Sequence, residues 1–145
     1  MKLFFDTCTV IDYLCNRQNG DRIEQILIKA EKEKWECFIS VGSFYTLTYL
    51  IELNLKRQGY PDKQERIEEL RNILDKILSI FSIAEINSID LHACIKNYSF
   101  TDLEDCYQYR AALNAKCDYL ITANIRDFKD ADNTHIKIIE PSEFF

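Results

Sequence analysis

The stretch that decides the fold is Lys2-Leu3-Phe4-Phe5-Asp6-Thr7-Cys8-Thr9-Val10-Ile11-Asp12-Tyr13-Leu14. Leu3 to Phe5 form a short apolar run without alternation, which is typical of a strand buried on both faces of a parallel sheet. Thr7 and Thr9 are candidate helix N-caps, and apolar residues at helical spacing follow them. Asp6 therefore lies where a buried strand passes into a helix, at the sheet edge where α/β proteins bind ligands. The alternative is that Asp6 only caps this helix.

The rest of the chain alternates short apolar strands with amphipathic helices. We expect strands over residues 36–40, 80–86, 118–122 and 136–139. We expect helices over 22–34, 43–57, 63–78 and 89–98, a further helix that opens within 99–105 and runs to about 116, and a turn over 59–62. This order predicts βαβ units with right-handed crossovers and a mostly parallel sheet. Because 145 residues suffice for one well-buried core, we expect a single domain over residues 1–145.

Composition narrows the classes of protein further. The net charge of −6, from 18 basic and 24 acidic residues, argues against general electrostatic binding of nucleic acid over the protein surface. The sequence has no apolar run of membrane-spanning length and no signal-peptide pattern, so we expect a cytoplasmic protein that does not enter a membrane. The six cysteines are scattered without a C-x-x-C pair, which favours reduced thiols over zinc ligands or disulfides.

Acidic residues also open the helix that begins within residues 99–105. Asp102 and Asp105 are three residues apart, so both side chains can point to one side of the helix. A capping box formed by Thr101 and Glu104 explains Glu104 well. It explains Asp105 poorly, because Asp105 shares a helix row with apolar and small residues. A carboxylate on such a packing face needs a metal ion or a hydrogen-bond donor.

Asp127 is a third acidic residue that follows an expected buried strand, although it could equally serve as a turn or cap residue. The fold places Asp6, Asp105 and Asp127 at one edge of the sheet. Carboxylates are the ligands that hard divalent cations bind, and paired metal ions can stabilise both the attacking and the leaving oxygen in phosphodiester cleavage. Other chemistries have less support. The two histidines, His92 and His135, have no serine or cysteine arrangement around them, and no glycine-rich phosphate loop is present.

Taken in order, these motifs resemble the PIN domain. They are Asp6-Thr7 after an apolar strand, Glu104-Asp105 opening a helix that contains Ala111-Ala112-Leu113, and Thr122-x-Asn124-x-x-Asp127-Phe128. The resemblance extends to the closing segment Glu140-Pro141-Ser142-Glu143-Phe144. It implies a three-layer α/β/α PIN-like fold with strand order 3-2-1-4-5, and Mg²⁺- or Mn²⁺-dependent cleavage of RNA. Many bacterial members are VapC-type toxins, so the resemblance also implies an antitoxin partner and a homodimer.

The hypothesis of a metal-dependent ribonuclease gives each candidate site residue a role. Asp6, Asp105 and Asp127 would be the catalytic metal ligands. The auxiliary residues would be Asp102, which assists the metal directly or through water, Asn124, which orients Asp127 or a phosphate, and Arg126, which meets the RNA backbone.

One position departs from the family pattern. PIN nucleases usually place a glutamate in the helix after the second strand, and this chain has Thr46 there. Glu52 faces another side of that helix, so Asp102 is the candidate for a fourth acidic group. Two alternatives to a ribonuclease stay open. A catalytically weakened PIN domain could act as a nucleic-acid- or protein-binding module. A phosphatase or phosphotransferase would want a second aspartate two residues after the first, which Thr7-Cys8 does not supply.

Overall fold

A computed structural model describes residues 1–60 and 62–145. It contains a five-stranded sheet in the order β3-β2-β1-β4-β5, in which each neighbouring pair of strands is parallel. The strands are β1 (Lys2–Phe5), β2 (Glu36–Ser40), β3 (Ser82–Ala84), β4 (Tyr119–Ile121) and β5 (Lys137–Ile139). The expected strand order is therefore confirmed, and β1 occupies the centre of the sheet.

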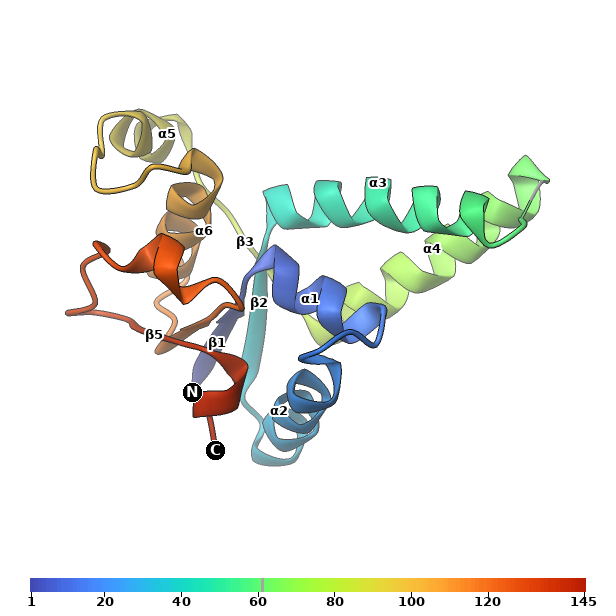
Figure 1. Cartoon of the computed structure of the whole chain (residues 1–145), viewed down its shortest axis with the longest axis horizontal. Coiled ribbons are helices and arrows are strands. Elements are labelled where there is room, and N and C mark those ends of the chain that lie inside the picture. The colour runs from blue at the N-terminus through green and yellow to red at the C-terminus, as the bar shows by residue number, and fades with distance from the viewer. Residues whose placement is uncertain (61) are drawn as a thin grey trace.

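Helices cover both faces of this sheet, which gives the three layers seen in Figure 1. They are α1 (Thr7–Leu14), α2 (Gly20–Glu33), α3 (Val41–Arg57), α4 (Lys63–Ile80), α5 (Ser88–Ile95) and α6 (Leu103–Asn114), with the 3₁₀ helices η1 (Ile125–Phe128) and η2 (Pro141–Glu143). The turn expected over 59–62 includes Pro61, which lies outside the described residues. Within the described ranges, no helix combines the length and apolar character needed to cross a membrane.

The core lies on the two faces of β1. Leu3 and Phe5 pack in one apolar cluster with residues of α1, α2, α3 and α4, whereas Phe4 packs in the opposite cluster with residues of α5, α6 and η1. All three side chains are fully buried. A run without alternation is required here because successive strand residues point to opposite faces and both faces are covered.

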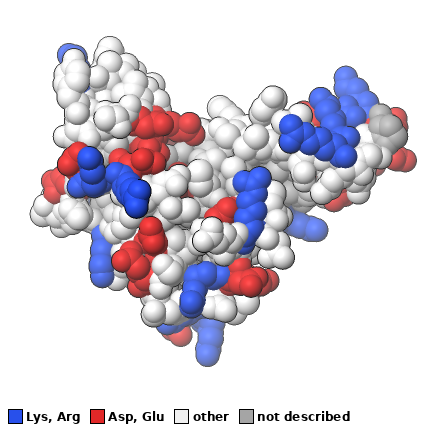
Figure 2. All heavy atoms as spheres, viewed as in Figure 1, with Lys and Arg blue, Asp and Glu red and all other residues white. Residues whose placement is uncertain are grey.

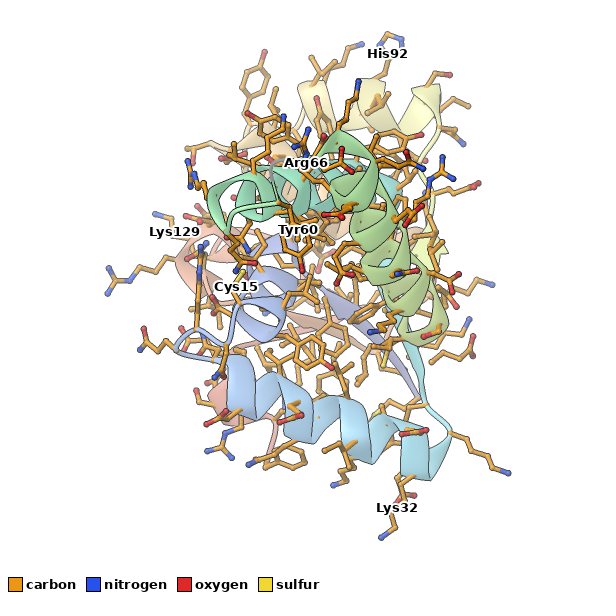
Figure 3. The ribbon with its side chains drawn as sticks, turned by 90° about the vertical axis from the view of Figure 1, so that its right-hand side faces the viewer. Cys15, Lys32, Tyr60, Arg66, His92 and Lys129 are labelled. Atoms are coloured by element: carbon orange, nitrogen blue, oxygen red, sulfur yellow. The ribbon has the colours of Figure 1, made fainter. Side chains whose placement is uncertain are left out.

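Helices α3 and α4 run side by side and project from the sheet as an arm (Figure 1). Glu52 of α3 lies 3.8 Å from the Arg66 guanidinium of α4 and 3.9 Å from Lys56. The Arg66 guanidinium also donates a 3.1 Å hydrogen bond to the carbonyl of Tyr60 near the far end of the arm, which Figure 3 views end-on. Glu52 is therefore engaged in ion pairs within the arm, so it does not replace the glutamate that is missing at Thr46.

Two helix caps differ from the sequence-based expectation. Asp6 is the N-cap of α1, as the alternative interpretation had it, and Thr7 and Thr9 are not, because Asp6 keeps the extended conformation of the strand (φ −65°, ψ 152°) and its side chain accepts from the backbone N–H of Thr7. Asp102 is the N-cap of α6, so the capping box expected to start at Thr101 is absent. Thr101 lies one residue too early to cap that helix. Both caps are aspartates whose short side chains reach the first free N–H groups.

Candidate functional site

Asp6 lies at the carboxyl end of the central strand. Its backbone N–H donates to the carbonyl of Ile121 at 3.0 Å, so β1 and β4 end side by side. Its Oδ1 accepts from the N–H of Thr7 at 2.7 Å, and its Oδ2 accepts from Oγ1 of Thr122 at 3.0 Å. Only 4% of Asp6 is exposed, and this burial raises its pKa to about 6 despite both donors. Each carboxylate oxygen still has a second lone pair for another ligand.

Asp105 lies half-buried in the first turn of α6. Burial is the main cause that raises the pKa of Asp105 to about 7, and the neighbouring charges of Asp102, Asp6, Asp127 and Glu104 raise it further. The structure therefore brings the three aspartates predicted from the sequence close enough to repel one another, and Asp102 lies with them. Glu104, which we interpreted only as a cap residue, also belongs to this acidic cluster.

The charges of the three central aspartates lie outside the ion pairs that the described residues form. In the described part of the chain, the ion pairs involve other acidic residues and leave out Asp6, Asp105 and Asp127. Figure 2 shows acidic side chains gathered where α6 begins, with Lys and Arg side chains beside them and others at the far end of the α3–α4 arm. His92 is exposed on α5 and points into solvent (Figure 3), and His135 is exposed as well. Within the described residues the three aspartates thus form no ion pair, although basic side chains lie beside the cluster.

The chemistry of these donors fits a hard divalent cation, which binds carboxylate oxygens and offsets their repulsion. Their positions are not those of a finished metal site. Among residues 1–60 and 62–145, no three His, Cys, Asp or Glu side chains are already placed to hold one ion. A cation would therefore have to draw Asp6, Asp105 and Asp127 together, or use water for its remaining ligands.

The residues of η1 border the cluster from the β4 side. Asp127 and Arg126 are both exposed, and the backbone N–H of Asp127 donates to the carbonyl of Asn124 at 3.0 Å. The Asn124 side chain points to α1, where its amide lies 3.7 Å from Sγ of Cys8. This contact directs the Asn124 side chain to α1. Cys8 is itself close to the cluster, since burial and then the charge of Asp6 raise the pKa of its thiol.

Sequence reasoning missed three polar side chains that support Asp6. Thr122 donates to Asp6 directly, while Ser43 and Gln108 reach it through Thr7. The sequence held one signal for them, because Gln108 is a polar residue three positions after Asp105 on the packing face of its helix. From α3, Ser43 contributes a neutral hydroxyl group to this region, and it lies three residues before the half-buried Thr46.

Comparison with known proteins finds one matching family and several solved structures with the same fold. A family model described as PIN domain matches residues 2–126. A chain of VapBC2 from Rickettsia felis, solved bound to a DNA fragment from their promoter, superposes with a TM-score of 0.65 at 16% identity, over 97% of this chain and 98% of that one. A toxin-antitoxin complex from Klebsiella pneumoniae gives a TM-score of 0.58 at 22% identity, over 96% and 97%. At such identities the likeness shows the fold. Curated proteins give no match.

Proposed function

Because this chain belongs to the PIN domain family, we propose that it is a divalent-metal-dependent ribonuclease of the VapC toxin type. It would hydrolyse phosphodiester bonds of RNA at the carboxyl edge of its sheet. The observation that carries the proposal is the meeting of Asp6 and Asp105 at this edge, where burial first and neighbouring acidic groups second raise their carboxyl pKa values to about 6 and about 7. Repulsion among these carboxylates favours binding of a cation.

Each acidic residue has a role in this proposal. Asp6, Asp105 and Asp127 would hold Mg²⁺ or Mn²⁺, and Asp102 would add negative charge beside Asp105. The bound ion would polarise the phosphate and lower the pKa of a water molecule. Thr7 and Thr122 hold Asp6 in place through hydrogen bonds to its two oxygens.

The residues of η1 would contact the substrate. Arg126 is exposed beside Asp127 and, within the described residues, takes part in no ion pair, so its guanidinium is available to an RNA phosphate. Asn124 is exposed at the start of η1 and could add a further polar contact to the phosphate. A local basic contact of this kind would hold the RNA backbone although the protein as a whole is acidic.

An antitoxin is the protein partner that we propose, in a cytoplasmic complex in which the toxin forms a homodimer. Support comes from an apolar cavity of about 480 Å³ beneath the α3–α4 arm, on the side that faces the viewer in Figure 3. Leucine and isoleucine side chains of α1, α3 and α4 line it, and Arg17, Arg57 and Lys76 are basic residues in its lining. This chemistry suits an amphipathic segment that carries acidic residues. Co-purification with the product of a neighbouring small gene tests this partner.

The test of the nuclease is RNA cleavage by the parent chain in Mn²⁺, in EDTA, and after Mn²⁺ is restored. Asp105→Asn is the site variant, and Asp75→Asn, an exposed acidic position on α4, is the matched control. We expect cleavage by the parent and the control in Mn²⁺, and loss of cleavage in EDTA and in Asp105→Asn. Cleavage that survives both chelation and Asp105→Asn would contradict a metal mechanism at this cluster.

A second function has specific support, namely a PIN domain with weakened catalysis that acts as a nucleic-acid- or protein-binding module. It is favoured by Thr46 in place of the usual glutamate and by the absence of a finished three-ligand site among the described residues. The same samples separate the two functions. A chain that shifts RNA in a gel but leaves it intact in Mn²⁺ is a binding module, and one that degrades it is a nuclease.

A further inference from the structure

A buried network of polar side chains lies beneath the acidic cluster. Its members are Thr7, Ser40, Ser43 and Gln108, whose exposed fractions are 6%, 6%, 0% and 2%. Buried polar groups are costly unless they are hydrogen-bonded, and an apolar core of the same volume would avoid that cost. A network of this kind in a protein interior therefore calls for an explanation other than the hydrophobic effect.

The hydrogen bonds of the network converge on Ser43. Nε2 of Gln108 donates to Oγ1 of Thr7 at 3.0 Å and to Oγ of Ser43 at 2.9 Å. The hydroxyl groups of Thr7 and Ser43 lie 2.6 Å apart, and Oγ of Ser40 donates to Oγ of Ser43 at 2.9 Å. The Ser40 oxygen in turn accepts from the N–H of Ser43 at 2.9 Å. These bonds join the start of α1, the junction of β2 with α3, and the first half of α6.

The network meets the acidic cluster at two places. Thr7 donates its backbone N–H to Oδ1 of Asp6, so any shift of Thr7 moves the donor of that carboxylate. Gln108 follows Asp105 by three residues, and residues at this spacing lie on one side of a helix. The amide of Gln108 therefore fixes the position of the helix that carries Asp105 relative to the strand that carries Asp6.

We infer that Gln108 is a positioning residue that sets the spacing between Asp6 and Asp105 for a divalent cation. The inference rests on the proposed function. Gln108 acts through Thr7 and Ser43 and does not itself contact the metal. Its two N–H donors are needed, because Thr7 and Ser43 sit on different elements and one side chain must reach both. Loss of groups that hydrogen-bond directly to metal ligands alters metal affinity by about 10–100-fold, and Gln108 acts one bond further from the ligand.

The test uses Gln108→Met, which keeps the side-chain length but removes the amide, and Ser43→Ala, which removes only the central hydroxyl. Asn114→Ala is the matched control. It lies on the same helix about 9 Å further along and donates to Asp90 at 2.8 Å, away from the cluster. Calorimetry with Mn²⁺ alone gives the dissociation constant, and thermal melting in EDTA gives the metal-free stability.

We expect Gln108→Met and Ser43→Ala to weaken Mn²⁺ binding by at least about tenfold, while Asn114→Ala binds as the parent does. Variants that melt at lower temperature but keep the parental dissociation constant would overturn the inference, since the network would then be structural alone. If Gln108→Met does not fold, Ser43→Ala decides by the same criterion. A parent that binds no Mn²⁺ would overturn the metal-dependent function together with the inference, whereas failure of the inference alone leaves the parental binding and RNA cleavage intact.

Discussion

Oγ1 of Thr122 donates a 3.0 Å hydrogen bond to Oδ2 of Asp6, so the residue that follows β4 holds the residue that follows β1. The hydroxyl is the donor because an ionised carboxylate oxygen can only accept, and the same hydroxyl accepts the backbone N–H of Asn124 at 3.0 Å. Thr122 is fully buried, so no solvent takes part. A neutral donor in this position stabilises the ionised form of Asp6 and lowers its pKa, although burial has the larger and opposite effect.

We predict that Thr122→Val destabilises the metal-free protein more at pH 8 than at pH 5. At pH 8 Asp6 is ionised and would lose a donor, which costs about 1–3 kcal/mol for a buried acceptor. At pH 5, below its pKa of about 6, Asp6 is mostly protonated and needs that donor less. Urea denaturation of parent and variant at the two pH values measures the difference.

Thr48→Val is the control for this prediction. The Thr48 hydroxyl donates to the carbonyl of Phe44 within α3, at 2.9 Å, and forms no hydrogen bond with a carboxylate of the described residues. Its loss should cost the same free energy of unfolding at both pH values. Equal losses at pH 5 and pH 8 for Thr122→Val would mean that Thr122 acts through packing and not through the charge of Asp6.

The metal-free protein should become less stable as the pH rises from 5 to 8. Asp6 and Asp105 have pKa values of about 6 and about 7 in the folded chain, above the value of about 3.9 for an unfolded one. Between these limits the folded state holds more protons, so the free energy of unfolding falls with rising pH. About one pKa unit separates pH 5 from the Asp6 pKa of about 6, so Asp6 alone accounts for about 1.4 kcal/mol of this fall.

Thermal melting of the metal-free chain across this pH range checks the trend. Asp90, whose pKa is lowered first by the N–H of Asn87, loses its stabilising effect only at more acidic pH, so it does not oppose the trend above pH 5. A melting temperature that rises steadily from pH 5 to pH 8 would show that the two carboxyl groups are not raised in pKa. Saturating Mn²⁺ should flatten the profile, because the cation offsets the repulsion.

The sheet and the meeting of the three aspartates follow from the sequence because both depend on local patterns. The unbroken apolar run Leu3 to Phe5 indicates a central strand, and parallel strands bring the residues after β1 and β4 to one edge. The first turn of α6 reaches the same edge, so Asp6, Asp105 and Asp127 approach each other without knowledge of side-chain geometry.

The supporting contacts do not follow from local patterns, since they join distant parts of the chain. Gln108 reaches Thr7 across 101 positions, and Thr122 reaches Asp6 across 116. Each bond depends on strand register and on the rotation of a helix about its axis, which periodicity does not define. The prediction that Thr7 or Thr9 caps α1 was wrong for a related reason. Asp6 keeps the extended conformation of the preceding strand, and that places its own side chain over the helix start.

Asp102→Asn should weaken Mn²⁺ binding, whereas Thr46→Val should not. After burial, the charge of Asp102 is the largest influence that raises the pKa of Asp105, so Asp102 adds to the attraction for a cation. Asparagine caps a helix as well as aspartate does, so the hydrogen bonds from the N–H groups of Glu104 and Asp105 are retained. The substitution therefore removes charge without unfolding the helix start.

Calorimetry with Mn²⁺ compares the two variants with the parent. We expect a weakening of about three- to tenfold for Asp102→Asn, which corresponds to about 0.7–1.4 kcal/mol, and no change for Thr46→Val. The opposite order would show that the hydroxyl of Thr46 contacts the ion. The position of the usual glutamate would then still serve as a ligand position in this chain.

Asp105→Asn should leave the metal-free protein at least as stable as the parent at pH 8. The Asp105 carboxylate takes part in none of the side-chain hydrogen bonds found among the described residues, so asparagine gives up no partner. It also removes a charge that Asp102, Asp6 and Asp127 repel. Asp75→Asn, which changes the net charge equally at an exposed position, is the control and should melt as the parent does.

Mn²⁺ should reverse this order of stabilities. An ion that binds the folded state stabilises it by RT ln(1 + [L]/Kd), about 2.7 kcal/mol at a hundredfold excess over Kd. The parent and Asp75→Asn should gain this free energy, and Asp105→Asn should gain much less because it has lost a ligand. Thermal melting of the three proteins, each in EDTA and in Mn²⁺, gives all the comparisons. A parent that gains nothing from Mn²⁺, beside an Asp105→Asn variant that melts well below it in EDTA, would make Asp105 a structural residue and favour the binding module over the nuclease.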